Sequence, residues 1–270
     1  MRETICLIAN SKNEAKALPR FLQHHAWADD ILVLDSLSTD ATPEICRHYG
    51  RRVHQAERGG NVNPRLMSAV SLCASDWLLL IDPDEFISEG LKQEILSLLS
   101  SPDARYAAYE FPRVNYFMEK PLSHGGWSGH ALKMFRTRCV RFDGNEYHEK
   151  PVVNGRIGRL TGDVRHYPNP NIHWILQKFN YISEFDLQEY RNKFGEISER
   201  RFRWLLFTKP LKNFWKCYVK KRGYRDGLHG LVYAALIWAC DVIRICKYGE
   251  RYVLKNPNTR PADELPDPWA

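Results

Sequence analysis

The sequence lacks several patterns that define common protein classes. No Gly-x-Gly-x-x-Gly follows the first predicted strand, which argues against a dehydrogenase that binds a dinucleotide. No Cys-x-x-Cys pair occurs, and the seven cysteines are scattered and odd in number. We expect them to be reduced, mostly buried thiols of a cytoplasmic protein. The amino terminus has no signal-peptide pattern, and the chain contains no internal repeat or low-complexity segment.

Long apolar runs are also missing. The longest, Leu231–Cys240, is too short to span a bilayer and runs into Asp241 and Arg244. With 270 residues, of which 44% are hydrophobic, the chain can form one large domain with an appendage.

Short apolar runs alternate with helical patterns through the first hundred residues. Strands are predicted at residues 4–9, 31–34, 53–55 and 77–81, and helices begin near Leu18, Thr42 and Asn63. Strands that alternate with helices in this way predict βαβ units and a parallel sheet.

Polar side chains follow three of these strands. They are Asn10 with Glu14, Asp35 with Ser36, and Asp82 with Asp84. Open α/β sheets bind ligands at the carboxyl ends of their strands. Carboxylates clustered there repel one another unless a cation lies between them, and oxygen ligands suit Mg²⁺ or Mn²⁺. The alternative to a cation site is that Asp82 and Asp84 belong to an acidic turn that caps the helix predicted after Ser88.

In order and spacing, these residues resemble family 2 glycosyltransferases of the GT-A fold. The resemblance is greatest to the bacterial β-glucosyltransferases of lipopolysaccharide-core and related surface-polysaccharide synthesis. It extends over residues 4–250 and is carried by residues 8–14, 33–42, 63–65, 82–85 (a DXD motif), 147–149 and 166. Leu37 stands where the family usually has Gly, and Pro83 where it has Ala, which we interpret as changes of loop shape.

The resemblance implies an α/β, GT-A architecture. This is a Rossmann-like, mostly parallel sheet flanked by helices, here with a C-terminal helical basic appendage. We expect the catalytic domain at residues 1–170, the helical segment at 171–255 and a loose tail at 256–270, which contains four prolines.

The resemblance also implies a site for a nucleotide-sugar donor. The residues expected to bind the nucleotide are Ala9, Asn10, Glu14, Asp35, Ser38, Arg65 and Asp82. Asp84 and His166 are expected at a Mg²⁺ or Mn²⁺ ion. Arg65 could instead be a surface helix residue, and His166 a buried structural one. Asp40 is expected to cap the helix that follows it.

Glu149 occupies the position at which this branch of the family carries a His-Glu pair. A carboxylate beside His148 and Lys150 should stay ionised, as a catalytic base must. Asp143 and Glu146 are the next candidates, and a strand-end pair on an exposed hairpin is the structural alternative. A zinc-protease motif is excluded because residues 152 and 153 are both Val.

The predicted activity is inverting transfer of a hexose, with UDP-glucose as the first choice of donor. The acceptor expected from the resemblance is a lipopolysaccharide core or another surface glycan. Acceptor contacts are expected from His124, Trp127, His130 and Trp174, although aromatic residues of this kind could equally lie in the core.

The basic charge of the chain is confined to one segment. Residues 200–260 contain 15 Lys or Arg and 3 Asp or Glu, a net charge of +12, whereas residues 1–199 carry −2. Aromatic residues are interleaved there, among them Trp204, Phe207, Phe214 and Trp215. This composition favours a peripheral anchor on the anionic inner face of the cytoplasmic membrane. A solvated helical face is the alternative, and we expect no nucleic-acid partner.

Two other functions are compatible with parts of the sequence. The first is a non-catalytic polysaccharide- or membrane-binding protein with a GT-A shell. The second is a sugar nucleotidyltransferase, which is disfavoured because the loop at residues 10–14 contains no Gly to hold a triphosphate.

Overall fold

The computed structural model describes residues 2–55, 63–101, 105–143, 150–168 and 171–259. The chain divides into two compact units. One contains residues 1–114 and 129–166, and the other contains residues 115–128 and 167–268. The second unit resumes at residue 167, close to residue 171, where the helical segment is predicted to begin. The hairpin 115–128, however, groups with the helices although it lies inside the range expected for the catalytic domain.

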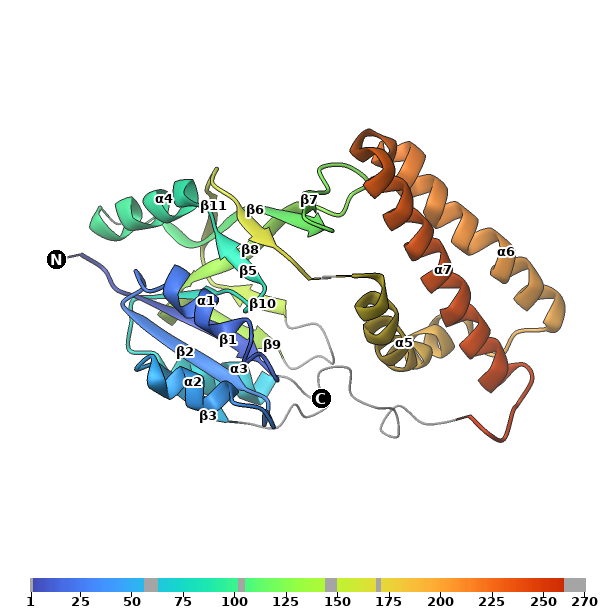
Figure 1. Ribbon diagram of the computed structural model, residues 1–270, viewed down its shortest axis with the longest axis horizontal. Helices are drawn as coiled ribbons and strands as arrows, with labels where there is room; N and C mark the ends of the chain where they lie inside the picture. The colour runs from blue at the N-terminus through green and yellow to red at the C-terminus, as the bar shows by residue number, and fades with distance from the viewer. Residues whose placement is uncertain (1, 56–62, 102–104, 144–149, 169–170, 260–270) are drawn as a thin grey trace. The chain divides into compact units, whose positions relative to one another are not determined.

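The first unit is built on a mixed sheet (Figure 1). Its strands are β1 (Ile5–Ser11), β2 (Asp30–Asp35), β3 (Arg52–Gln55), β4 (Trp77–Leu80), β5 (Glu85–Ile87), β6 (Tyr106–Phe117), β8 (Gly129–Arg136), β11 (Arg156–Arg159) and β12 (Val164–His166). The strand order is β3-β2-β1-β4-β8-β6-β12-β5, with β11 pairing β6. A separate hairpin consists of β9 (Val140–Asp143) and β10 (Lys150–Val153). The four strands from β3 to β4 are parallel, as the sequence predicts, whereas β8 is antiparallel to both β4 and β6.

The alternation of side chains along β1 gives the sheet two apolar faces. Ile5, Leu7 and Ala9 belong to one core cluster, and Cys6 and Ile8 to the other, because successive side chains of a strand point to opposite faces. The first cluster includes residues of α1 (Leu18–His24), α2 (Thr42–His48) and α4 (Glu89–Ser100), and the second includes residues of α3 (Asn63–Leu72). The sheet is therefore covered by helices on both faces.

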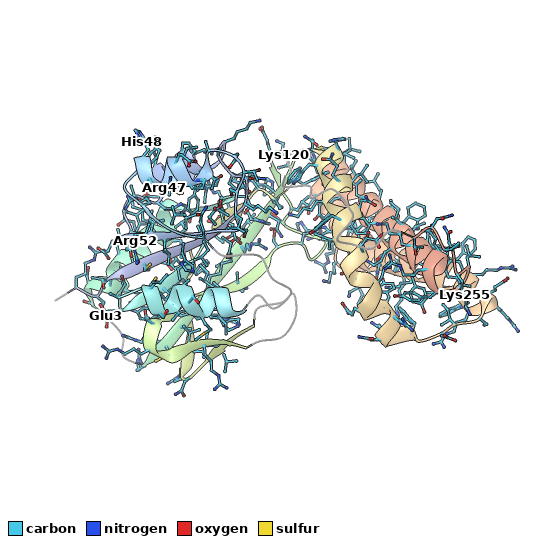
Figure 2. The ribbon with its side chains drawn as sticks, turned by 90° about the horizontal axis from the view of Figure 1, so that it is seen from below. Glu3, Arg47, His48, Arg52, Lys120 and Lys255 are labelled. Carbon is cyan, nitrogen blue, oxygen red and sulfur yellow. The ribbon has the colours of Figure 1, made fainter. Side chains whose placement is uncertain are left out.

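Polar contacts hold the ends of this sheet. Arg52 on the edge strand β3 (Figure 2) pairs with Asp30 and donates to the Leu72 carbonyl at 2.9 Å. Glu3 accepts from Trp77 Nε1 at 2.6 Å and from Arg136 Nη1 at 2.8 Å. All seven cysteines are free thiols, and four of them are buried, as the sequence predicts.

The second unit combines a short hairpin with a helical group. Its helices are α5 (Ile172–Phe194), α6 (Glu199–Trp215) and α7 (Gly227–Tyr252), with a π-helical turn at Lys216–Lys220 and a 3₁₀ turn at Gly223–Asp226. The hairpin pairs the end of β6 with β7 (Lys120–Pro121). Leu187, Tyr190, Leu205, Ile245 and Tyr248 form the buried core that joins the three helices. Residues 260–270 of the predicted tail lie outside the described residues.

Candidate active site

The loops that follow β1 and β2 are bonded to each other. Ser38 Oγ accepts from the backbone N–H of Asn13 at 2.8 Å, and Asn13 Oδ1 accepts from that of Thr39 at 2.8 Å. Asp40 accepts from the backbone N–H groups of Thr42 and Ala15, both at 3.0 Å. Asp40 therefore holds the first residue of α2 and the loop that contains Glu14. The N-cap of α2 is Ala41, so Asp40 stands one position before the cap that we predicted it to form.

Asp35, at the end of β2, is fully buried. Its carboxylate accepts from the hydroxyl and backbone N–H of Ser38 and from Gln55 Nε2 at 2.9 Å. These bonds satisfy the buried charge and fix the loop shape. Asp35 and Ser38 therefore shape the site.

Leu37 explains one departure from the family pattern. Its backbone has φ +55°, in the left-handed region that glycine adopts most easily, and its side chain is exposed. The loop thus keeps the conformation that a glycine would favour. The change of loop shape that we expected at Leu37 is therefore not required by its backbone conformation.

The DXD segment forms a turn at the topological switch point of the sheet. The backbone N–H of Glu85 donates to the Asp82 carbonyl at 2.9 Å, so Pro83 occupies the second position of a four-residue turn, where its fixed φ is favoured. Asn10 Nδ2 lies 3.4 Å from Asp82 Oδ1. The strand order reverses between β1 and β4, which is where open α/β sheets bind their ligands.

The pairing of β5 with β12 brings His166 to the DXD segment. His166 lies opposite Glu85 in the antiparallel register, and its Nε2 is 3.3 Å from Asp84 Oδ2. The His166 side chain is 12% exposed and that of Asp84 is 36% exposed. The two predicted metal ligands therefore lie side by side at an accessible position.

Two basic residues of this site were not predicted from the sequence. Glu85 is fully buried, and its carboxylate pairs with Arg113 Nε at 2.6 Å and with Lys133 Nζ. Lys133 Nζ also lies 3.8 Å from Asp82 Oδ2. Arg113 belongs to β6 and Lys133 to β8, and the signal that could have revealed Lys133 is a charge within the apolar run of residues 131–135.

The pKa values of Glu85 and Asp82 are shifted in opposite directions. Burial acts to raise the pKa of Glu85, but Lys133 and then Arg113 overcome it and hold this pKa below the ordinary value. Desolvation raises the pKa of Asp82. Lys133 acts to lower this pKa, whereas the charges of Glu85 and Asp84 raise it further. The Asp82 side chain is 42% exposed. A further cation near Asp82 would therefore be favourable.

The other predicted donor-site residues differ in how they are placed. Ala9 is fully buried within a core cluster, so only its backbone could meet a ligand. The backbone N–H of Glu14 donates to Thr42 Oγ1 at 2.9 Å, and its side chain is partly exposed. The Arg65 side chain and Glu149 lie outside what the structure describes, as does Glu146, and the side chain of Asp143 is not described either. The assignments of Arg65 and Glu149 stay predictions.

Three of the four predicted acceptor residues belong to the second unit, and two of these make side-chain contacts within it. His124 is held by Asp226, which accepts from His124 Nδ1 at 2.8 Å and from its backbone N–H at 2.9 Å. Trp127 packs edge-on against Tyr233, with ring centroids 4.5 Å apart. His130 is exposed on β8, and Trp174 lies in the first turn of α5.

No group of three or more His, Cys, Asp or Glu side chains among the described residues could enclose a metal ion. Asp84 and His166 nevertheless offer two adjacent donors. Such a pair fits a metal that shares its coordination with substrate phosphates, because Mg²⁺ is usually bound through one or two carboxylates, water and phosphate oxygens.

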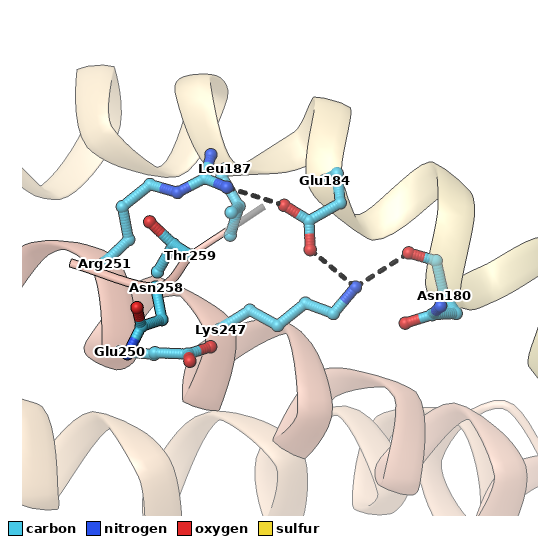
Figure 3. Close-up of a pocket in the computed structure, with 8 residues that line it drawn as sticks. All are labelled: Asn180, Glu184, Leu187, Lys247, Glu250, Arg251, Asn258 and Thr259. Atoms are coloured by element: carbon cyan, nitrogen blue, oxygen red, sulfur yellow. Dashed lines mark hydrogen bonds and ion pairs between the residues drawn. The ribbon is translucent and has the colours of Figure 1, made fainter. Parts of the chain in front are cut away.

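A polar hollow of about 290 Å³ lies elsewhere, among the helices of the second unit (Figure 3). Glu184 on α5 accepts from Lys247 Nζ at 2.7 Å and from Arg251 Nη2 at 3.0 Å, both on α7. Glu250 also lines the hollow, so its two acidic and two basic side chains balance, and we interpret the network as structural.

The family of the protein follows from its sequence profile. Residues 6–152, more than half of the chain, match the Glycosyl transferase family 2 model. The chain belongs to this family. It is therefore a glycosyltransferase and an enzyme, and its helix-flanked mixed sheet is the expected GT-A fold.

Relatives match over nearly the full chain. An uncharacterized glycosyltransferase of Rickettsia felis is 26% identical over 269 residues, which are 95% of this chain and 93% of the relative. One of Rickettsia typhi is 26% identical over 274 residues, 94% of this chain and 89% of the relative.

Two solved structures are also similar. That of Staphylococcus aureus TarS 1–349 with UDP aligns with 95% of this chain and 93% of its own, at 14% identity and a TM-score of 0.47. The second is glucosyl-3-phosphoglycerate synthase from Mycobacterium tuberculosis, solved with Mn²⁺, UDP and glucosyl-3-phosphoglycerate. The alignment covers 42% of this chain and 44% of the synthase chain, at 17% identity and a TM-score of 0.35.

Proposed function

We propose that this glycosyltransferase transfers a hexose from a nucleotide-sugar, with inversion and with the help of Mg²⁺ or Mn²⁺. UDP-glucose is the proposed donor, and a lipopolysaccharide core or another surface glycan is the proposed acceptor. The choice of donor and acceptor rests on the resemblance of the motifs to the bacterial β-glucosyltransferase branch.

One observation supports the donor site above all. Asn10, Asp82, Asp84 and His166 come from three separate segments and meet at the switch point of the sheet, where two contacts of 3.3–3.4 Å join them in pairs. A diphosphate placed there would lie near Lys133 and would meet the carboxylates of Asp82 and Asp84 through a divalent cation. With that cation bound, the arrangement suits a nucleoside diphosphate better than an uncharged ligand.

Asp84 and His166 are the residues that would hold the divalent ion. When bound, the ion would neutralise negative charge on the diphosphate as the bond to the sugar breaks. Lys133 would lower the repulsion between Asp82 and that diphosphate, because its ammonium lies close to Asp82.

Calorimetry of UDP-glucose binding with Mn²⁺ and with EDTA tests this site. Asp84→Asn removes one ligand charge, so donor affinity with Mn²⁺ should fall at least about tenfold, a change of 1.4 kcal/mol. Glu44→Gln, which neutralises an exposed carboxylate on α2, is the matched control and should bind normally. Equal affinity of the wild type in EDTA would reject the metal role.

Glu149 is the proposed base for the acceptor hydroxyl. It would take the hydroxyl proton while the acceptor oxygen attacks the anomeric carbon, and the nucleoside diphosphate would leave from the opposite side. This geometry inverts the configuration at that carbon.

Glu149→Gln keeps the size of the side chain but cannot accept a proton. Transfer should fall by about 10²–10⁴-fold, the usual contribution of a positioned base, while donor affinity stays nearly unchanged. Near-normal transfer would reassign the base to Asp143 or Glu146, and comparison with Asp143→Asn and Glu146→Gln would show which one carries it.

A further inference from the structure

Helix α6 exposes four large apolar side chains in a row. Trp204 is 65% exposed, Phe207 69%, Leu211 58% and Trp215 63%. Their spacing of three, four and four residues places them on one face of the helix, because an α-helix turns by about 100° per residue. They form a continuous strip along about three turns, which we call the α6 strip.

The α6 strip lies opposite the face that packs against the rest of the second unit. Leu205 and Pro210 are buried, and Asn213 donates to Asp241 of α7 at 2.6 Å. On a helix with 3.6 residues per turn these positions are centred roughly half a turn away from the strip. The helix is therefore apolar on two opposite faces, of which the core of the unit covers only one.

Basic residues border the α6 strip on both sides. Arg203 lies on one flank, Arg201 and Lys212 lie on the other, and all three are exposed. The acidic member of α6 is Glu199, which pairs with Arg203 at 3.0 Å. Long basic side chains in this position can bury their methylene stems while their charged ends reach outward.

We propose that the α6 strip binds the surface of an anionic lipid membrane, with its apolar side chains in the acyl boundary and the flanking cations at the headgroups. An apolar face between two rows of Lys and Arg is typical of helices that lie in the membrane interface. Trp204 and Trp215 stand near the two ends of the strip, and Trp side chains favour the headgroup level. Phe214, included in the sequence-based anchor, instead packs against Tyr218 at 5.4 Å and is only partly exposed.

A lipid surface fits these charges better than a second copy of the chain. Two copies facing each other through the α6 strip would bring like charges together along both borders. Anionic headgroups would instead neutralise them.

Helix α7 does not offer an equally good membrane-spanning alternative. By length and composition, the stretch Gly223–Tyr252 could cross a membrane, and 28% of its most apolar window is buried in the chain. Yet Asp241 and Arg244 lie within it, and Arg244 Nε is 2.8 Å from Asp186 of α5. Crossing a bilayer would require these groups to leave the polar contacts that hold α5 and α7 together.

Flotation of the full chain with lipid vesicles tests the proposal. The wild type should bind vesicles of phosphatidylglycerol and phosphatidylethanolamine, and bind phosphatidylcholine vesicles much less. Phe207→Ser with Leu211→Ser should weaken binding at least about tenfold, because two large apolar side chains no longer enter the interface. The matched control is Ile157→Ser with Leu254→Ser, two similarly exposed side chains outside α6, and it should bind as the wild type does.

Charge and insertion can be separated in the same assay. Arg201→Gln with Lys212→Gln should lower binding about fivefold for each charge at low salt and have little effect at high salt. The tryptophan emission of the wild type should shift to shorter wavelength on anionic vesicles, and Trp204→Phe with Trp215→Phe should remove most of that shift. Circular dichroism melting of each variant confirms that it is folded.

Three results would overturn the proposal. These are absence of wild-type binding to anionic vesicles, equal binding by the Phe207/Leu211 variant, and a wild-type dimer that this variant converts to a monomer. The last result would assign the α6 strip to a second copy of the chain. UDP-glucose affinity, measured on the same samples, is independent of every outcome because α6 contributes no residue to the donor site.

Discussion

At the scale of single residues, the candidate site depends on the buried, charged side chain of Glu85, which supports the site without contacting a ligand. Glu85 is completely enclosed and is ionised beside Lys133 and Arg113. Its Oε2 also accepts from the backbone N–H of Asp82 at 3.2 Å. Glu85 therefore fixes the turn that presents Asp82 and Asp84, and Lys133 joins the buried charge to the open one.

Lys133→Met tests this arrangement. The substitution leaves Glu85 with one cation instead of two, so the free energy of unfolding should fall by about 3 kcal/mol, in the range for a broken buried ion pair. Chemical denaturation measures this change. Lys92→Met, which removes a surface pair with Glu89, is the control and should change stability by less than about 0.5 kcal/mol. A similar small loss for Lys133→Met would show that Arg113 alone is enough to hold Glu85.

At the scale of elements, α1 ends on a buried histidine. His25 is fully enclosed, its Nδ1 bonds the Phe21 carbonyl at 3.0 Å, and its Nε2 has no partner among the described residues. Desolvation, and then the neighbouring His24, lower the pKa of His25 to about 3. The folded protein therefore keeps His25 neutral where the unfolded chain would bind a proton.

This difference predicts an acid-sensitive fold. Stability from His25 is complete above the unfolded value of 6.5 and is lost as the pH falls toward the folded value of about 3. Each pH unit in that window removes up to about 1.4 kcal/mol, because the unfolded state holds one more proton. Denaturant titrations at pH 7 and pH 5 measure the loss, which should be smaller in His25→Gln. His48→Gln, at an exposed position of α2, should leave the pH slope unchanged.

At the scale of the whole molecule, the donor site and the basic surface belong to different parts of the chain. The predicted donor and metal residues all fall between residues 9 and 166, whereas the net charge of +12 lies in residues 200–260. Donor binding and surface attachment should consequently respond to different substitutions.

A thermal-shift panel of nucleotide-sugars with Mn²⁺ tests this separation and the donor at once. A ligand at about a hundred times its dissociation constant should stabilise the protein by roughly 2.7 kcal/mol. UDP-glucose should give the largest shift, in the wild type and equally in Arg201→Gln with Lys212→Gln. A larger shift with another nucleotide-sugar would replace UDP-glucose as donor, and no shift with any of them would reject the site.

Much of the first unit could be predicted from local sequence. Short apolar runs bounded by polar residues, such as residues 77–81, predict buried strands, and the polar residues after them mark the carboxyl edge of the sheet. Ser88 caps α4, with its hydroxyl accepting from the Leu91 N–H at 3.3 Å, so the cap is this serine and the acidic turn lies before it. The assignment of Glu149 rests on the resemblance, since that residue lies outside the described part of the chain.

Local sequence predicts the parallel strands and their polar ends, because these depend on residues close together in the chain, and the order of the motifs along the chain indicates the glycosyltransferase family. Which distant side chains meet depends on how the strands pair in three dimensions. Lys133 reaches Glu85 because β8 and β5 belong to one sheet, and His166 reaches Asp84 because β12 pairs with β5. The sequence also could not predict which face of α6 is exposed. Both faces of the helix are apolar, and only the packing of the helix determines which one stays uncovered.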